Sequence, residues 1–184
     1  MQQAAFPLLA SWTNFYVIVG SSAGALTGLQ FVVMTLIAGA QVESNMREVR
    51  AFGTPTVVHF CMALLISALI NAPWPTPFLL GLYLAACGTA GIAYTMTVIR
   101  HARKAAYNPD TEDWIWYAVL PCIAHTALTA AAILLWWHPV AALFAIAAIT
   151  LLFLFVGIHN SWDTVTYIAV RKRQDGKPEG PNGS

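Results

Sequence analysis

Charged residues are scarce in this sequence. Asp, Glu, Lys and Arg make up 9% of its 184 residues, whereas hydrophobic residues make up 58%. Soluble domains carry about 25% charged residues, which help water to solvate their surface. So little charge excludes an ordinary water-soluble domain of this length. It indicates instead a chain whose apolar surface faces a lipid bilayer.

Recognisable catalytic and nucleic-acid-binding motifs are also missing. The sequence has no GxSxG elbow, P-loop, HExxH pair or dinucleotide-type glycine pattern. It has no basic stripe or zinc-finger spacing, so we do not expect nucleic acid as a partner. The three cysteines, Cys61, Cys87 and Cys122, fall in apolar stretches without CxxC spacing. This pattern favours small packing residues over disulfides or metal ligands.

Five continuously apolar segments are long enough to cross a bilayer. A helix needs about 20 apolar residues to span ~30 Å of hydrocarbon, and an isolated strand would leave its backbone groups unpaired there. The sequence predicts an all-α, polytopic transmembrane helical bundle over residues 1–170. Its five spans are expected at about 14–40, 55–72, 77–100, 114–137 and 140–170. Residues 171–184, which are rich in glycine, are predicted to form a disordered cytoplasmic tail.

The basic residues give this bundle an expected orientation. All nine lie on one side of the predicted membrane, in the loop after the first span, the connection after the third, and the tail: Arg47, Arg50, Arg100, Arg103, Lys104, Arg171, Lys172, Arg173 and Lys177. The N-terminus and the other two turns contain none. The positive-inside rule places the basic side in the cytoplasm. We therefore predict five spans with the N-terminus outside and the C-terminus inside.

The fifth predicted span holds the strongest candidate for a functional site. His159 and Asp163 are four residues apart, so a helix places them on one face. Asp163 is the only carboxylate that lies well inside a predicted span. A charged group at the centre of a membrane helix costs about 3 kcal/mol on the insertion scale. We expect Asp163 to be paired, protonated or hydrated.

Further polar residues fall in the same half of the predicted bundle. Gln30 is in the first span, His59 in the second, Tyr94 and Thr97 in the third, and Asn160 in the fifth. Together with the pair in the fifth span, they predict a polar cluster that opens toward the cytoplasm. One interpretation is purely structural, because polar side chains also hold helices together in lipid.

The functional interpretation gives each group a role. Asp163 is the charged group, His159 is its titratable neighbour, and Gln30 and Asn160 are neutral ligands, with His59 nearby. We expect an integral membrane protein that binds or conducts a small ion or a proton through this pocket. An enzyme is less expected, because the loops are too short to hold a catalytic domain.

Two alternatives for the function stay open. His125 lies midway along the fourth span at nearly the depth of His159, and paired with His159 or His59 it could ligate a haem. The chain would then be a redox subunit. Alternatively, it is a non-catalytic accessory subunit of a larger membrane complex.

The first span carries Gly20, Gly24 and Gly28 at four-residue spacing. This GxxxGxxxG stripe allows close approach of another helix. That helix belongs either to the same chain or to a second copy, so a homo-oligomer is one expectation. In the fourth span, Pro121 predicts a kink and a freed carbonyl one turn earlier, near Trp116 and Tyr117.

Three segments carry a resemblance to known sequences. They are FYVIVG with ALTGLQFVV at 15–33, GTPTVVHF at 53–60, and GIHNSWDTVTY at 157–167. The chain resembles an uncharacterised family of small bacterial five-span inner-membrane proteins. The resemblance implies a multi-pass protein of the bacterial cytoplasmic membrane, and it implies no activity.

Overall fold

The computed structural model describes the backbone of residues 5–39, 46–103 and 111–175. All regular structure in these residues is helical, and none of it is strand. Five helical segments are long and apolar enough to cross a membrane, at Thr13–Thr35, Thr54–Asn71, Pro77–His101, Thr111–Leu134 and Pro139–Thr166. The prediction of an all-α chain with five candidate spans is therefore confirmed.

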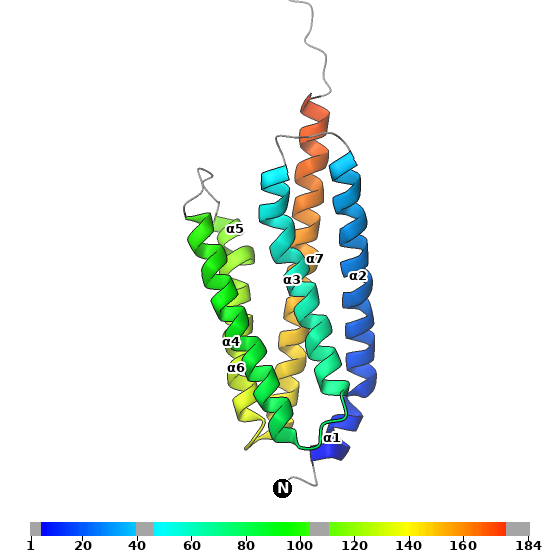
Figure 1. Ribbon diagram of the computed structural model, residues 1–184, viewed down its shortest axis with the longest axis vertical. Coiled ribbons are helices and arrows are strands. Elements are labelled where there is room, and N and C mark those ends of the chain that lie inside the picture. Colours follow the sequence, from blue (N-terminus) through cyan, green and yellow to red (C-terminus); the bar gives the residue numbers. More distant parts are fainter. Residues whose placement is uncertain (1–4, 40–45, 104–110, 176–184) are drawn as a thin grey trace, which may run out of the picture.

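Figure 1 shows the helices side by side along one long axis. The order is α1 (Ala5–Ser11), α2 (Thr13–Gly39), α3 (Met46–Asn71), α4 (Pro77–Ala102), α5 (Thr111–Trp114), the π-helical turn η3 (Ile115–Val119), α6 (Leu120–Leu134) and α7 (Pro139–Asp175). The elements α5, η3 and α6 continue directly into one another and make up the fourth span.

The helices differ from the sequence prediction in three places. The short helix α1 was not expected, because seven residues cannot span a bilayer. Helix α3 begins at Met46 and runs through Pro55, where the sequence suggested a span start. Helix α7 continues to Asp175, so the predicted disordered tail is helical over 171–175, where basic residues suit a helix C-terminus. The rest of that tail, 176–184, lies outside the described residues.

The bundle consists of a three-helix group and a helix pair. Helix α2 packs on α3, and α3 packs on α7. Helix α4 packs mainly on α6, and α6 in turn packs on α7, whereas α3 and α4 touch little. Figure 1 shows the α4–α6 pair leaning away from α3 at the end where α4 finishes. The long helix α7 is thus the element that joins the two parts.

All helix ends that carry basic residues lie at one end of the bundle. Helix α3 starts there, and α4 and α7 finish there, whereas the turns that join α3 to α4 and α6 to α7 lie at the other end (Figure 1). We call these the basic end and the turn end. Lys104 and Lys177 lie outside the described residues.

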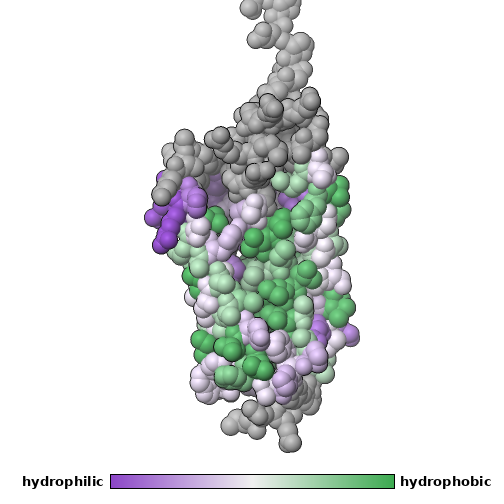
Figure 2. Space-filling view, in the orientation of Figure 1, coloured by the Kyte–Doolittle hydropathy of each residue, from purple (hydrophilic) through white to green (hydrophobic). Residues whose placement is uncertain are grey.

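The outer surface of the bundle is apolar, as a membrane environment requires. Ile18, Phe144 and Trp162 are 66%, 64% and 70% exposed. Figure 2 shows mainly apolar residues around the middle of the bundle, and strongly hydrophilic residues where α4 ends and α5 begins. The buried core near the turn end is equally apolar, with fully buried leucines and isoleucines from four helices: Ile66, Leu80, Leu84, Leu128, Leu143 and Ile146.

Glycines allow the helix pair to pack closely. A Cβ atom added at Gly88 of α4 would lie 2.9 Å from both the carbonyl oxygen of His125 and the amide nitrogen of Thr129 on α6. An added Cβ at Gly91 would run into the His125 ring. Gly157 of α7 receives Phe60 of α3 in the same way, at 2.5 Å. The sequence analysis considered only the glycines of the first span and missed these positions.

Replacing Gly88 by alanine tests this close packing. The new Cβ meets backbone atoms, which cannot rotate away, so we expect Gly88→Ala to lower the free energy of unfolding in detergent by roughly 1–3 kcal/mol. The matched control is Gly24→Ala, because a Cβ there has nothing within 4 Å. Equal stability of the two variants would show that α4 and α6 are not packed as described.

Candidate functional site

His159 of α7 lies between two carboxylates near the basic end. Its Nδ1 is 3.3 Å from Oδ2 of Asp163, and its Nε2 is 3.8 Å from Oε1 of Glu112. The contact with Asp163 has ion-pair distance without hydrogen-bond alignment. The His159 side chain is 25% exposed and that of Asp163 is 42% exposed. The predicted His159–Asp163 pair is therefore formed at the rim of the bundle, within reach of water.

Glu112 was not assigned to the site by sequence analysis. It lies in the first turn of α5, where an acidic residue also complements the helix dipole. The sequence indicated only that Glu112 starts the fourth span on the same side of the membrane as Asp163. The structure shows in addition that α5 lies beside α7, which brings Glu112 to His159.

A π-helical turn aims two aromatic side chains at α7. In η3 the amide of Leu120 donates to the carbonyl of Ile115, five residues earlier, and Pro121 follows at once. The predicted helix distortion before Pro121 is thus present as a π-turn. The Trp116 ring stacks on His159, with centroids 3.6 Å apart and planes 8° apart. The Tyr117 hydroxyl donates to the carbonyl of Asn160 at 3.4 Å.

Gln30 and Asn160 lie buried just inside this rim. The Ser161 hydroxyl of α7 donates to Oε1 of Gln30 on α2 at 3.1 Å, which ties these two helices together. The Thr164 hydroxyl donates to the carbonyl of Asn160 within α7. Both predicted neutral ligands therefore lie in the bundle interior. Asn160 follows the rim residue His159 in sequence, and Gln30 contacts Ser161.

His59 and His125 are buried deeper and contact one ring. His59 of α3 stacks on Phe153 of α7 at 6.3 Å between centroids, and His125 of α6 packs on Phe153 at 4.7 Å. Gly91 leaves the space against α4 that the His125 ring fills. The predicted site residues and Glu112 thus form two layers: the rim layer of His159, Asp163 and Glu112, and a buried layer of Gln30, Asn160, His59 and His125.

The third span contributes less than expected. Thr97 is exposed, and its hydroxyl donates to the carbonyl of Ala93 in its own helix. Thr97 was predicted to face the polar cluster; the α4–α6 packing turns it outward instead. Tyr94 is half-buried.

The described side chains offer little to a metal or a haem. They contain no group of three or more His, Cys, Asp or Glu residues that could hold a metal ion. A bis-histidine haem would need a planar space beside His125, where the Phe153 ring and the α4 backbone at Gly91 already lie. A redox role would require Phe153 to move away.

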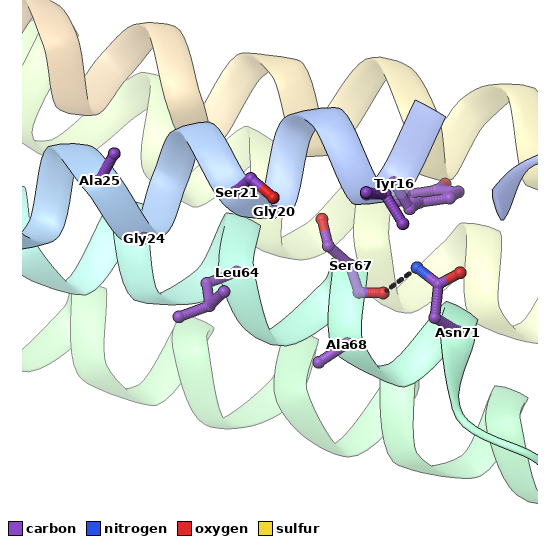
Figure 3. A pocket seen from close by; sticks show the side chains of 10 residues that line it. Tyr16, Gly20, Ser21, Gly24, Ala25, Leu64, Ser67, Ala68 and Asn71 are labelled. Atoms are coloured by element: carbon purple, nitrogen blue, oxygen red, sulfur yellow. Dashed lines mark hydrogen bonds between the residues drawn. The ribbon is translucent and has the colours of Figure 1, made fainter. Parts of the chain in front are cut away.

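The predicted glycine stripe of α2 serves two different purposes. A Cβ at Gly20 would lie 2.8 Å from Cβ of Ser67, so this glycine is used for packing against α3. At Gly24 and Gly28 a Cβ would have nothing within 4 Å. A groove of about 390 Å³ runs between the helices here, lined by Gly20, Ser21, Gly24, Ala25, Leu64 and Ala68 among others. Figure 3 shows it, with the hydrogen bond from Asn71 to the carbonyl of Ser67 at one end.

Comparison with protein-family models, curated proteins and solved structures finds no match to this chain.

The Ser161–Gln30 hydrogen bond is a test of the α2–α7 contact. We expect Ser161→Ala to lower the free energy of unfolding by about 0.6 kcal/mol, the average for such bonds within membranes. Ser22→Ala is the matched control, because the Ser22 hydroxyl is exposed and donates only to Ile18 in its own helix. Unfolding in mild detergent measures both; an equal effect of the two changes would contradict the contact.

Proposed function

We propose that this protein resides in the bacterial cytoplasmic membrane and binds a proton at His159 from the cytoplasmic side. The observation that carries the proposal is the position of the His159 ring between two carboxylates, at 3.3 and 3.8 Å. The basic end faces the cytoplasm by the positive-inside rule. The N-terminus is then outside and the C-terminus inside.

The arrangement suits a protonated ring. Neutral imidazole has one N–H donor and one nitrogen lone pair, whereas imidazolium has two donors. With a carboxylate near each nitrogen, a neutral ring would turn a lone pair toward an anionic oxygen. Proton uptake removes that repulsion and turns both contacts into attractive ones. Asp163 and Glu112 are thus the charged groups and His159 is the titratable group.

Trp116 adds to the preference for a cation. Its ring lies flat against His159, and an aromatic face attracts a positive charge. A metal ion would need at least one further ligand, and the described residues contain no suitable cluster. A proton is the cation that this site can bind with the groups it has.

Binding from one side is better supported than conduction through the whole bundle. Toward the turn end, the core consists of residues such as Leu84, Leu128 and Ile146, all fully buried. The hydroxyls of Ser67 and Thr150 in that half donate to carbonyls of their own helices. Among the described residues, most buried polar atoms without a hydrogen-bond partner therefore lie at mid-bundle or toward the basic end, and the Tyr16 hydroxyl near the turn end is an exception.

Nuclear magnetic resonance of the protein with ¹⁵N-labelled histidine tests this proposal. In Asp163→Asn we expect the ¹⁵N signals of His159 to move toward those of a neutral ring, because the anionic neighbour 3.3 Å from Nδ1 is lost. The double variant with Glu112→Gln should show a larger change. His138, exposed at the turn end, is the internal control and should not change. An unchanged His159 in the double variant would refute the site.

A second candidate function is association with another membrane helix. The observation that favours it is the open space over Gly24 and Gly28, which the chain itself leaves unfilled. Small residues at such a surface let two backbones approach closely in lipid. The occupant would be a second copy of this chain, or a helix of a larger complex in which the protein is an accessory subunit.

Gly24→Leu tests association, because the added Cβ has no atom within 4 Å and the rest of the side chain extends into the groove. If the protein self-associates in lipid nanodiscs, we expect this variant to weaken association at least tenfold, as counted by single-molecule photobleaching. The control is Ala130→Leu, an exposed position on α6. A wild type that is monomeric and copurifies with no partner would exclude this candidate.

A further inference from the structure

Four buried side chains in the middle of the bundle and toward its basic end carry atoms without hydrogen-bond partners among the described residues. These atoms are Nε2 of Gln30, Nδ1 of His59, both ring nitrogens of His125, and Nδ2 and Oδ1 of Asn160. All four side chains are at most 3% exposed. They come from α2, α3, α6 and α7, and all four lie in the bundle interior.

Buried polar atoms without a protein partner indicate that another molecule binds them. Nearly all buried polar groups in native proteins have a partner, and bound water supplies it where the protein does not. Surrounding lipid supplies neither donors nor acceptors. The alternative occupant, a metal ion, lacks a cluster of ligands in the described residues. Water fits this mixed set, because it can donate to imidazole and amide acceptors and accept from amide donors.

The four side chains follow one buried face of α7. Phe153 and Asn160 are seven residues apart, two turns along the same face of the helix. His59 and His125 pack on Phe153, whereas Asn160 lies beside the rim residue His159 in sequence. The unpaired atoms therefore extend from the rim layer to the middle of the bundle. Beyond Phe153, toward the turn end, the face continues with the apolar residues Ile149 and Ile146.

We infer that a chain of bound water connects the rim at His159 with His125 and His59, and that these two histidines are a second, deeper proton-exchanging site. The inference rests on the proposed function for the place where protons enter. Each transfer breaks an N–H bond at one ring as another forms along the water chain. A proton that leaves His159 for His125 makes His159 neutral and His125 cationic, so the total charge is unchanged.

The surroundings of His125 are consistent with exchange along this route. The titratable group near it is His59, whose ring packs on the same Phe153 ring as His125. From α4 it meets the backbone at Gly91, and from α7 it meets the Phe153 ring, neither of which carries charge. Its own helix contributes Thr129, whose hydroxyl donates to the His125 carbonyl and leaves the ring nitrogens free.

Asn160 is the residue that controls this route. It is fully buried, its side-chain amide has no protein partner, and it directly follows the rim residue His159 on the buried face of α7 that also carries Phe153. An apolar side chain of similar length would remove the only polar side chain on this stretch of the buried face. Asn160→Leu should therefore separate the water at His125 from the rim, whereas Asn160→Ala leaves room for water.

Water-edited solid-state nuclear magnetic resonance on the full chain in lipid bilayers is the test. In the wild type we expect polarisation from water to reach the His125 and His59 rings nearly as fast as His159. Leu128, in the apolar core, serves as the dry reference. In Asn160→Leu the transfer from water to His125 should slow at least threefold, while the transfer to His159 stays as fast as in the wild type. In Asn160→Ala the transfer to His125 should remain fast. That contrast would show that the leucine in Asn160→Leu acts by excluding water.

Two results would overturn the inference. If transfer from water to His125 in the wild type is as slow as transfer to Leu128, there is no water chain. If transfer to His125 is equally fast in Asn160→Leu, the water does not pass Asn160. Failure of the rim site is distinguishable, because it appears as unchanged protonation of His159 in the carboxylate variants, whatever the water contact of His125.

Discussion

Burial of polar groups inside a bundle surrounded by hydrocarbon is the constraint on which the rest of this structure depends. Lipid hydrocarbon forms no hydrogen bonds, so each polar side chain must have a partner in the protein or in bound water. Most hydroxyls in the spans do so locally, by donating to a carbonyl of their own helix, as Thr95 and Thr150 do. The imidazole, amide and carboxylate groups cannot be satisfied in that way. They gather on α7 and its neighbours, and this gathering defines the candidate site.

Close packing in this protein comes from small residues rather than from a hydrophobic driving force. In lipid, apolar side chains gain little by leaving the surroundings, so helices associate where backbones can approach. Gly88 and Gly91 let α6 lie against α4, and Gly157 receives Phe60. The packing at Gly91 also fixes the His125 ring. The same residues that hold the helix pair together therefore position a titratable group in the interior.

The rim and the buried layer make one continuous functional proposal. The π-turn before Pro121 brings Trp116 to His159 and Tyr117 to Asn160, so two consecutive residues contact the two layers. A proton bound at the rim has polar groups beside it on one side and an apolar core beyond them. This asymmetry favours reversible loading from the basic end over passage through the membrane.

The sequence alone determined the number of spans, the basic end and the pairing of His159 with Asp163, because length, charge distribution and i,i+4 spacing act locally. It also placed Gln30, His59 and Asn160 in one half of the bundle by depth, and His125 midway along the fourth span. It missed Glu112, placed Thr97 wrongly, and took Gly24 for the same kind of position as Gly20. Depth along a helix can be counted from the sequence, whereas the direction a residue faces depends on how helices rotate against one another. That rotation is set by contacts between distant segments, such as α4 on α6, so only the tertiary structure decided which polar groups meet.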